Sequence, residues 1–205
     1  MTTVGVIDCG ISNVGSVQNA FAFLGIETRL ITAPADLGEC SHVVLPGDGT
    51  FPVGMENLRA RALDGAIQDA VRAGKPLLGI CLGMQLLATC GEEFGTTAGL
   101  ALTDGRVILL KPDDPRLPVP QIGWNDVTFR GRSRLAEGLG EGGCFYFMQS
   151  YGFEDPGVPA VVGTCDYGGP VVAVIEQDNV FGVQFHPEKS QQAGLRILAN
   201  FSRIQ

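Results

Sequence analysis

The sequence predicts an α/β fold, with a central, mainly parallel sheet, helices on both faces and an antiparallel extension. Short apolar runs alternate with segments of helical periodicity in the first half of the 205 residues. Several short strand-like runs follow one another in the second half, separated by Gly, Pro, Asn and Asp. Apolar strands that alternate with helices indicate a parallel sheet covered on both faces.

The first half contains four predicted strands and three predicted helices. The strands are Thr3–Cys9, Ile26–Ile31, His42–Pro46 and Pro76–Ile80. The helices are Ser12–Leu24, Gly54–Ala73 and Leu82–Thr89. Glycines follow the first two helices directly, as expected at helix C-termini.

The second half predicts the antiparallel or mixed extension and a last helix. Its strands are Arg106–Leu110, Asp126–Phe129, Cys144–Met148, Ala160–Cys165, Val171–Gln177 and Val180–Phe185, and the helix is Ser190–Ile204. The segment Lys111–Pro120 holds four prolines in ten residues and predicts a loop. Strand-like sequence resumes at once, so we predict a single domain over residues 1–205.

Charge and composition exclude several classes of function. The 22 acidic and 14 basic residues give a net charge of −8, which argues against nucleic acid or an anionic membrane as the main partner. No uncharged apolar run approaches the roughly 18 residues of a membrane span, and the N-terminus does not resemble a signal peptide. The six cysteines form no CxxC pair, so we expect no zinc site, no disulfide framework, no cofactor and a reducing cytoplasm.

Cys81 stands in a pattern typical of a nucleophile. Gly79-Ile80-Cys81-Leu82-Gly83 follows an apolar strand and begins a helix, as in a nucleophile elbow. Small neighbours permit the strained turn, and the helix N-terminus favours a thiolate. The N–H of Leu82 is then a natural oxyanion donor. The alternative is a small buried cysteine between two turn glycines, but the strand before it and the helix after it favour the nucleophile.

His186 is the better of two candidate bases. His42 begins a predicted strand and is interpreted as structural, whereas His186 ends one and can reach the same sheet edge as Cys81. Glu188 follows two residues later, and its carboxylate could orient the imidazole. In isolation, His186-Pro187-Glu188 could equally be a strand end with a surface acid. Together with Cys81 it predicts a Cys-His-Glu triad.

These motifs resemble those of the class I, or triad, glutamine amidotransferases. The matching residues are Cys-Leu-Gly-Met-Gln at 81–85 and Phe-His-Pro-Glu at 185–188. The resemblance implies a flavodoxin-like fold, attack of the Cys81 thiolate on the carboxamide of glutamine, release of ammonia and hydrolysis of a glutamyl thioester. It also implies that Gln85 contacts the substrate and that the backbone at Gly47 and Asp48 completes the oxyanion hole.

Further motifs are similar to the glutaminase subunits of imidazole glycerol phosphate synthases. They are Ser12-Asn13, Leu45-Pro46-Gly47, Glu92-Glu93-Phe94-Gly95, Gly123-Trp124-Asn125, Phe145-Tyr146-Phe147, Ser150-Tyr151 and Gly182 to Ser190, and the likeness runs from residue 4 to residue 201. This family implies docking on a (β/α)₈-barrel cyclase subunit that uses the ammonia in histidine biosynthesis. It places Glu93, Ser150 and Tyr151 around the glutamine, and Trp124 and Lys189 towards the partner.

Four positions depart from that family pattern. The family usually has a small apolar residue at Asp48, His at Gln121 and Gln149, and Gly at Ser12. A carboxylate that points towards a developing oxyanion would oppose catalysis, whereas an outward-facing Asp48 would be tolerated. Three alternatives therefore stay open: a paralogue that supplies ammonia to another synthase, such as one making amidino sugars; a catalytically silent scaffold; and an unrelated cysteine protein with the same elbow. The Phe185–Glu188 motif argues against the last.

Overall fold

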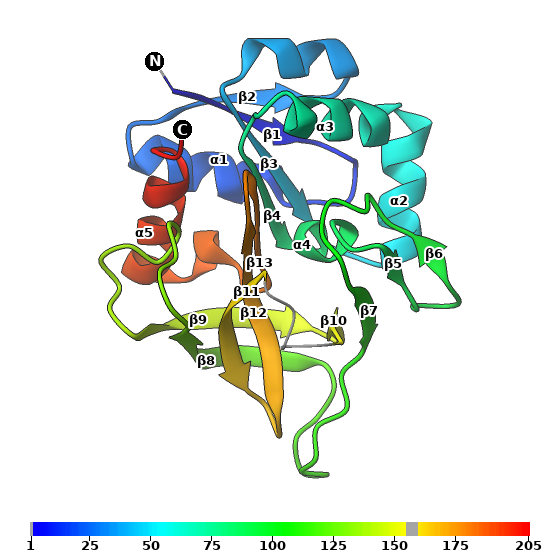
Figure 1. Ribbon diagram of the computed structural model, residues 1–205, viewed down its shortest axis with the longest axis vertical. Coiled ribbons are helices and arrows are strands. Elements are labelled where there is room, and N and C mark those ends of the chain that lie inside the picture. Colours follow the sequence, from blue (N-terminus) through cyan, green and yellow to red (C-terminus); the bar gives the residue numbers. More distant parts are fainter. Residues whose placement is uncertain (1, 155–159) are drawn as a thin grey trace.

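A nine-stranded sheet forms the centre of the computed structural model, which describes residues 2–154 and 160–205 (Figure 1). The strand order is β2-β1-β3-β4-β13-β12-β11-β8-β9. The first five strands in that order are parallel: β2 (Glu27–Ile31), β1 (Thr3–Ile7), β3 (His42–Gly47), β4 (Leu77–Cys81) and β13 (Val180–Val183). This is the doubly wound, flavodoxin-like order, which confirms the predicted parallel sheet.

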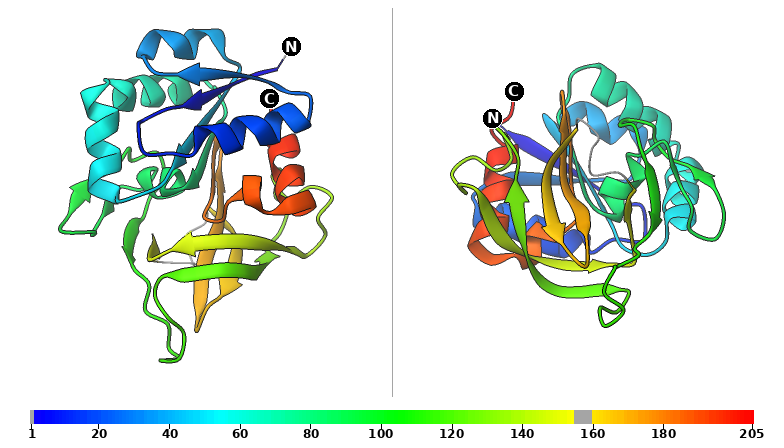
Figure 2. Two further views of the ribbon diagram at one scale, coloured as in Figure 1. Left: turned by 180° about the vertical axis from the view of Figure 1, so that it is seen from behind. Right: turned by 60° about the horizontal axis from the view of Figure 1, so that its bottom comes forward.

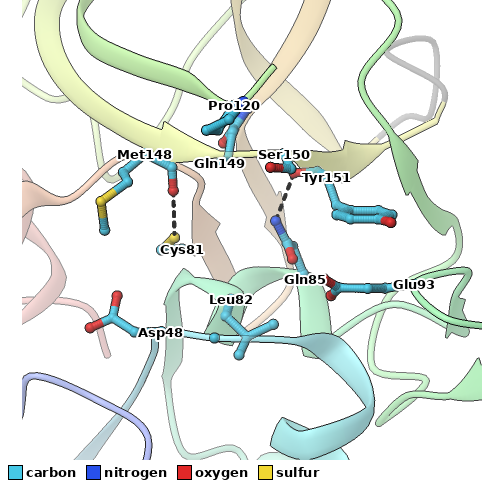
Figure 3. A pocket seen from close by; sticks show the side chains of 11 residues that line it. Asp48, Cys81, Leu82, Gln85, Glu93, Pro120, Met148, Gln149, Ser150 and Tyr151 are labelled. Atoms are coloured by element: carbon cyan, nitrogen blue, oxygen red, sulfur yellow. Dashed lines mark hydrogen bonds between the residues drawn. The ribbon is translucent and has the colours of Figure 1, made fainter. Parts of the chain in front are cut away.

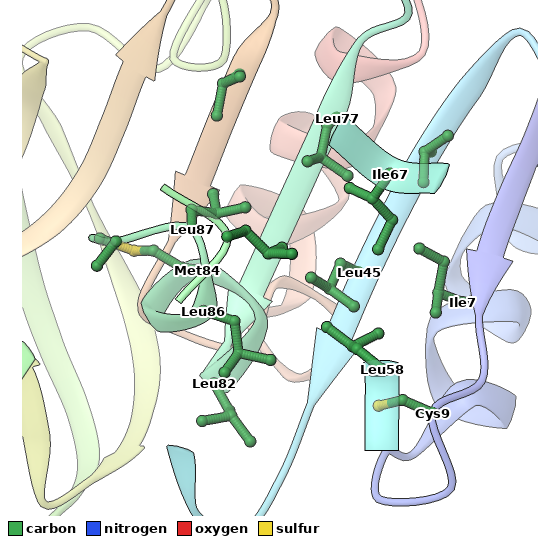
Figure 4. Close-up of a cluster of buried hydrophobic side chains, with 14 of the residues drawn as sticks. Ile7, Cys9, Leu45, Leu58, Ile67, Leu77, Leu82, Met84, Leu86 and Leu87 are labelled. Atoms are coloured by element: carbon green, nitrogen blue, oxygen red, sulfur yellow. The ribbon is translucent and has the colours of Figure 1, made fainter. Parts of the chain in front are cut away.

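Helices cover both faces of the parallel strands, as predicted (Figure 2). Helices α1 (Val14–Phe23) and α5 (Gln191–Phe201) pack on one face against Val4, Val6 and Leu78. Helices α2 (Phe51–Ala60), α3 (Leu63–Arg72) and α4 (Leu82–Leu86) pack on the other. Figure 4 shows this second cluster, where Leu58, Ile67 and Leu82 meet Leu45 and Leu77 of the sheet.

The prediction of one helix over Gly54–Ala73 is wrong, because the chain makes two helices there. Ala62 lies between α2 and α3 in the left-handed region, with φ of +54°. Leu58 and Leu63 are both fully buried. Residues five apart in a continuous helix point in directions about 140° apart. The break lets both leucines reach the same core.

The other helices are present with shorter bounds than the sequence indicates. Helix α4 ends at Leu86 rather than at Thr89, and α5 ends at Phe201. Helix α1 begins after Asn13, whose side-chain Oδ1 accepts a hydrogen bond from the Ser16 N–H at 3.2 Å. Two 3-10 helices, η1 (Pro34–Glu39) and η2 (Pro187–Lys189), complete the helical elements among the described residues.

The antiparallel extension is confirmed. Strand β12 (Pro170–Gln177) runs antiparallel to β13, and β11 (Val161–Asp166), β8 (Gln121–Phe129) and β9 (Gly142–Gln149) follow. Strand β8 begins at Gln121, five positions before the predicted start, so that Trp124 stands on a strand.

A second, four-stranded sheet has no counterpart in the prediction. It consists of β10 (Tyr151–Phe153), β7 (Arg106–Leu109), β5 (Cys90–Gly91) and β6 (Thr97–Ala98). Only β7 was predicted as a strand, and it lies in this sheet rather than in the extension. The others are two or three residues long, which is too short for periodicity to indicate.

No described helix is both long and apolar enough to cross a membrane.

Candidate active site

Cys81 occupies a strained turn between β4 and α4. Its φ of +54° and ψ of −114° are unusual for a residue with a side chain. A Cβ added at Gly83 would lie 1.7 Å from the Leu45 carbonyl oxygen, and one at Gly79 would lie 2.6 Å from the Gly83 oxygen. The two glycines therefore permit the contact between strand and helix that holds this turn.

His186 and Glu188 form a buried pair beside Cys81. His186 follows β13 and is 3% exposed, and its Nδ1–H donates to Glu188 Oε1 at 2.8 Å. This bond directs the opposite ring nitrogen, Nε2, into the site. Nε2, Cys81 Sγ and a carboxylate oxygen of Asp48 lie within 4.8 Å of one another. The structure thus brings together the three residues of the predicted triad.

His42 takes a structural position, as predicted. Its Nε2 bonds to the Ile204 carbonyl oxygen at 2.8 Å, and its ring packs edge-on against Phe201. Burial lowers its pKa below 6.5 and outweighs the opposing effect of the Ile204 carbonyl.

The surroundings of His186 favour the charged ring. Burial alone lowers the pKa of this imidazole, but the neighbouring Cys81 and Glu188 outweigh burial and raise the pKa to about 10. An imidazolium at this place can hold a thiolate on Cys81 and can donate a proton to a leaving group.

Asp48 lies at the edge of the site, with its carboxylate towards His186 and partly exposed to solvent. Its Oδ1 lies 4.0 Å from His186 Nε2, and 39% of its side chain is exposed. Its backbone N–H donates to the Ile11 carbonyl oxygen at 2.7 Å. The carboxylate therefore does not point wholly outward, which is the arrangement that we expected to be tolerated.

A cavity of about 240 Å³ opens next to Cys81 (Figure 3). Six of the seven predicted substrate-binding residues line it: Asp48, Leu82, Gln85, Glu93, Ser150 and Tyr151. Gly47 instead borders a smaller cleft with His186 and Glu188. The cavity is slightly below the roughly 300 Å³ at which sites for drug-sized ligands begin, so it suits a small polar molecule.

Gln184 is a site residue to which the sequence analysis assigned no role of its own. It is fully buried, its Nε2 lies 3.8 Å from Cys81 Sγ, and its Oε1 accepts from Gln85 Nε2 at 3.1 Å. Gln85 also donates to the Tyr151 carbonyl oxygen at 2.8 Å. The available signal was a polar residue within the apolar run that precedes His186, because such groups are buried only with partners.

Glu93 joins the cavity to helix α2. Its Oε2 accepts a hydrogen bond from the Phe51 N–H at 2.8 Å, at the first residue of that helix. Thr50, the residue before the helix, makes no side-chain cap. Glu93 therefore replaces the missing cap from across the cavity.

Two of the residues that depart from the family pattern contact each other. Gln121 and Gln149 are direct partners across β8 and β9, and both are buried. Gln149 Nε2 donates to Gln121 Oε1 at 3.3 Å. The two positions at which the family resemblance implies histidine thus carry a pair of hydrogen-bonded amides.

Trp124 and Lys189 lie on one exposed surface, which we call the β8–β9 face and define by Ile122, Trp124, Tyr146, Met148 and Lys189. The Trp124 and Tyr146 rings meet edge-on with centroids 6.0 Å apart, and Lys189 Nζ lies 5.9 Å from the Tyr146 centroid. Trp124 is 49% exposed and Ile122 is 60% exposed.

Comparison with known proteins identifies the family. The family model described as "Glutamine amidotransferase class-I" matches residues 5–204. An "Imidazole glycerol phosphate synthase subunit HisH" from Symbiobacterium thermophilum is 44% identical, over 100% of this chain and 95% of that protein. The subunit of the same name from Streptococcus sanguinis is 46% identical, over 96% and 93%.

A solved structure shares the fold at low sequence identity. The structure of PurLQS from Thermotoga maritima superposes with a TM-score of 0.76 at 19% identity, over 98% of this chain and 97% of that one. Because the family model spans nearly the whole sequence, this chain belongs to the class I glutamine amidotransferase family.

Proposed function

We propose that this chain is the glutaminase subunit of an imidazole glycerol phosphate synthase, with glutamine as substrate and ammonia and glutamate as products. The observation that carries the proposal is the placement of Cys81 on a strained elbow beside the buried His186–Glu188 pair. Full-length relatives that bear this name, at 44% and 46% identity, support the assignment.

In the proposed reaction, the Cys81 thiolate attacks the carboxamide carbon of glutamine. His186 gives its Nε2 proton to the departing nitrogen, so that ammonia leaves and a glutamyl thioester remains. His186 then takes a proton from water, which attacks the thioester. The Cys81 sulfur leaves as the thiolate, and the glutamic acid so formed loses its proton to solvent, which restores the starting thiolate and imidazolium. Glu188 keeps the imidazole in the required orientation throughout.

The oxyanion formed in each step needs backbone donors. Leu82, at the N-terminus of α4, is one candidate. Asp48 N–H is the other, but it is bonded to the Ile11 carbonyl oxygen. We propose that this bond opens when the site becomes active, since one N–H cannot point at Ile11 and at the cavity together.

The remaining cavity residues are proposed to hold glutamine. The Glu93 carboxylate suits the α-ammonium group of an amino acid, and Gln85, Ser150 and Tyr151 surround it with hydrogen-bonding groups. We propose no metal or cofactor for this reaction.

We propose the β8–β9 face as the docking surface for the (β/α)₈-barrel cyclase subunit in a heterodimer. An exposed tryptophan beside exposed Ile122 and Met148 is typical of an interface centre. The net charge of −8 gives no reason to expect nucleic acid or membrane as a partner. The six free cysteines are consistent with a reducing cytoplasm as the compartment.

The decisive experiment measures steady-state glutamate release with and without the barrel subunit and its nucleotide ligand. We expect slow hydrolysis by the chain alone, strong stimulation by the complex, and no turnover by Cys81→Ala in either. If the barrel subunit and its nucleotide ligand did not stimulate glutamate release, the assignment to an imidazole glycerol phosphate synthase would be refuted.

Asp48, Gln121 and Gln149 favour one second candidate, a paralogue that feeds ammonia to a different synthase. It shares the glutaminase chemistry, so it predicts turnover by the chain without stimulation by the cyclase subunit.

A catalytically silent scaffold predicts instead that Cys81→Ala changes no function at all.

A further inference from the structure

Three potential metal ligands converge where Asp48, Cys81 and His186 meet. One ligand atom from each lies within 4.8 Å of the others, and Asp48 Oδ1 lies 4.0 Å from His186 Nε2. The residues come from the end of β3, the end of β4 and the segment after β13, so their spacing in the sequence gives no sign of a metal site.

The state of His186 points to a ligand. Its Nε2 is buried and has no hydrogen-bond partner among the described atoms, although the residue is only 3% exposed. Its Nδ1–H donates to Glu188 Oε1 at 2.8 Å. A carboxylate behind a histidine, with the other ring nitrogen free, is the arrangement that orients a histidine ligand for zinc.

The donor set fits zinc chemistry. Thiolate sulfur, imidazole nitrogen and carboxylate oxygen are the three donor types that Zn²⁺ takes in proteins, and a water can complete the tetrahedron. Metal–ligand bonds of about 2.0–2.3 Å would place the donor atoms roughly 3.3–3.6 Å apart. Asp48 Oδ1 and His186 Nε2, 4.0 Å apart, are separated by somewhat more than this, and the Asp48 side chain, 39% exposed, has room to turn.

Asp48 distinguishes this site from one that offers only a cysteine and a histidine as metal ligands. It supplies the third ligand, and its charge together with that of the Cys81 thiolate balances the two charges of the ion. A small apolar residue at this position would leave only two ligands.

We propose that Asp48, Cys81 and His186 bind a zinc-type divalent cation, and that the bound ion reversibly blocks the nucleophile. Coordination releases one proton from the Cys81–His186 pair to solvent and involves no oxidation or reduction. Binding of the ion is independent of the proposed function, whereas the block of turnover rests on the proposed role of Cys81.

The binding experiment titrates metal-free, tag-free protein with Co²⁺, whose thiolate complexes absorb by charge transfer, and then displaces it with Zn²⁺. We expect one ion per chain and a thiolate band that is lost in Cys81→Ala. Asp48→Asn and Asp48→Val should each weaken the affinity by about tenfold or more, at least the loss caused by removing an outer-shell partner.

A matched control is Cys144→Ser, because Cys144 is an exposed thiol next to Asp126 and outside the site. It should leave the band and the affinity unchanged. Thermal unfolding of each variant checks that the fold is retained. Equal affinity in wild type and both Asp48 variants, or a thiolate band that persists in Cys81→Ala, would overturn the proposal.

The activity experiment separates this proposal from the proposed function. Zn²⁺ should stop glutamate release by the wild-type complex, a chelator should restore it, and Asp48→Asn should need about tenfold more Zn²⁺ for the same inhibition. A protein that binds Co²⁺ but never hydrolyses glutamine would refute the glutaminase assignment and leave the metal site standing. An active protein that binds no ion would refute the metal site and leave the glutaminase assignment standing.

Discussion

At the scale of single residues, opposite environments act on the only two histidines of the chain. His42 lies against the C-terminal segment, and burial dominates its ionisation. His186 is more deeply buried, yet Cys81 and Glu188 reverse the effect of burial. The same side chain therefore serves as a neutral core group in one place and as a charged group in the other.

We expect the pKa of the His42 imidazole to lie below 6.5 and that of the His186 imidazole to lie above it. In NMR spectra of histidine-labelled protein, the His42 resonance should shift below that pH, and the His186 ring should stay protonated until about pH 10. Cys81→Ala should lower the pKa of His186, because it removes a neighbour that raises it. An unchanged His186 titration in Cys81→Ala would contradict the coupling between them.

His42 also gives a prediction for stability in acid. Its pKa is lower in the folded than in the unfolded chain, so the unfolded chain binds the proton more readily. Well above pH 6.5 the ring is neutral in both states, and ionisation of His42 does not change the free energy of unfolding. As the pH falls through 6.5 towards the folded pKa, the free energy of unfolding decreases. Denaturant unfolding between pH 8 and pH 5 measures this, and His42→Gln should flatten the loss.

At the scale of elements, two short connections decide the shape of the site. The turn at Ala62 separates α2 from α3, and the contact from Glu93 to Phe51 ties the start of α2 to the hairpin formed by β5 and β6. Asp48 lies only three residues before Phe51. The position of the proposed oxyanion donor therefore depends on how the start of α2 is held.

Ala62→Gly should stabilise the protein by about 0.5–1 kcal/mol, because glycine adopts the left-handed region without the clash of a Cβ. Denaturant unfolding measures the free energy. The matched control is Ala70→Gly within α3, which should instead destabilise by up to about 1 kcal/mol. A loss of stability in Ala62→Gly would show that the turn is not strained.

Glu93 should reveal two separable roles. Glu93→Gln keeps an oxygen acceptor for the Phe51 N–H but removes the charge, so stability should stay near wild type while the KM for glutamine rises. Glu93→Ala should raise KM as well and also cost about 1 kcal/mol of unfolding free energy, as for a lost helix cap. Equal stability of the two variants would argue against the capping role.

At the scale of the whole molecule, the extension of the sheet places an apolar surface close to the nucleophile. The Met148 carbonyl oxygen lies 3.7 Å from Cys81 Sγ, and its side chain is on the exposed β8–β9 face. Met148 and Gln149 of β9 also line the cavity (Figure 3), so the strand that carries this face borders the cavity directly. A partner that docks there would contact the strand that borders Cys81.

Trp124→Ala should weaken association with the barrel subunit by at least tenfold, since central aromatic residues contribute about 2 kcal/mol or more to such interfaces. Glutamate release by the chain alone should not change. The control is Phe23→Ala, a residue 74% exposed on α1 and outside the β8–β9 face, which should leave association intact. Calorimetric titration of one subunit with the other gives both affinities.

The sequence alone determined the sheet, its helices and the family, because these depend on local patterns. Apolar runs such as His42–Pro46 indicate buried strands, and the Gly79–Gly83 spacing indicates the elbow. It missed the short strands β5, β6 and β10, which are too brief to carry a period. It also joined α2 to α3, since both helices have the same periodicity and the break is a single left-handed residue.

Only the tertiary structure decided what surrounds the nucleophile. Asp48, Cys81 and His186 are separated by more than 30 residues at each step, and no local pattern states which way the Asp48 carboxylate turns. The packing of β3, β4 and β13 in register brings the three side chains together. Sequence patterns fix which residues form each strand, whereas side-chain proximity arises from how the strands are ordered in space.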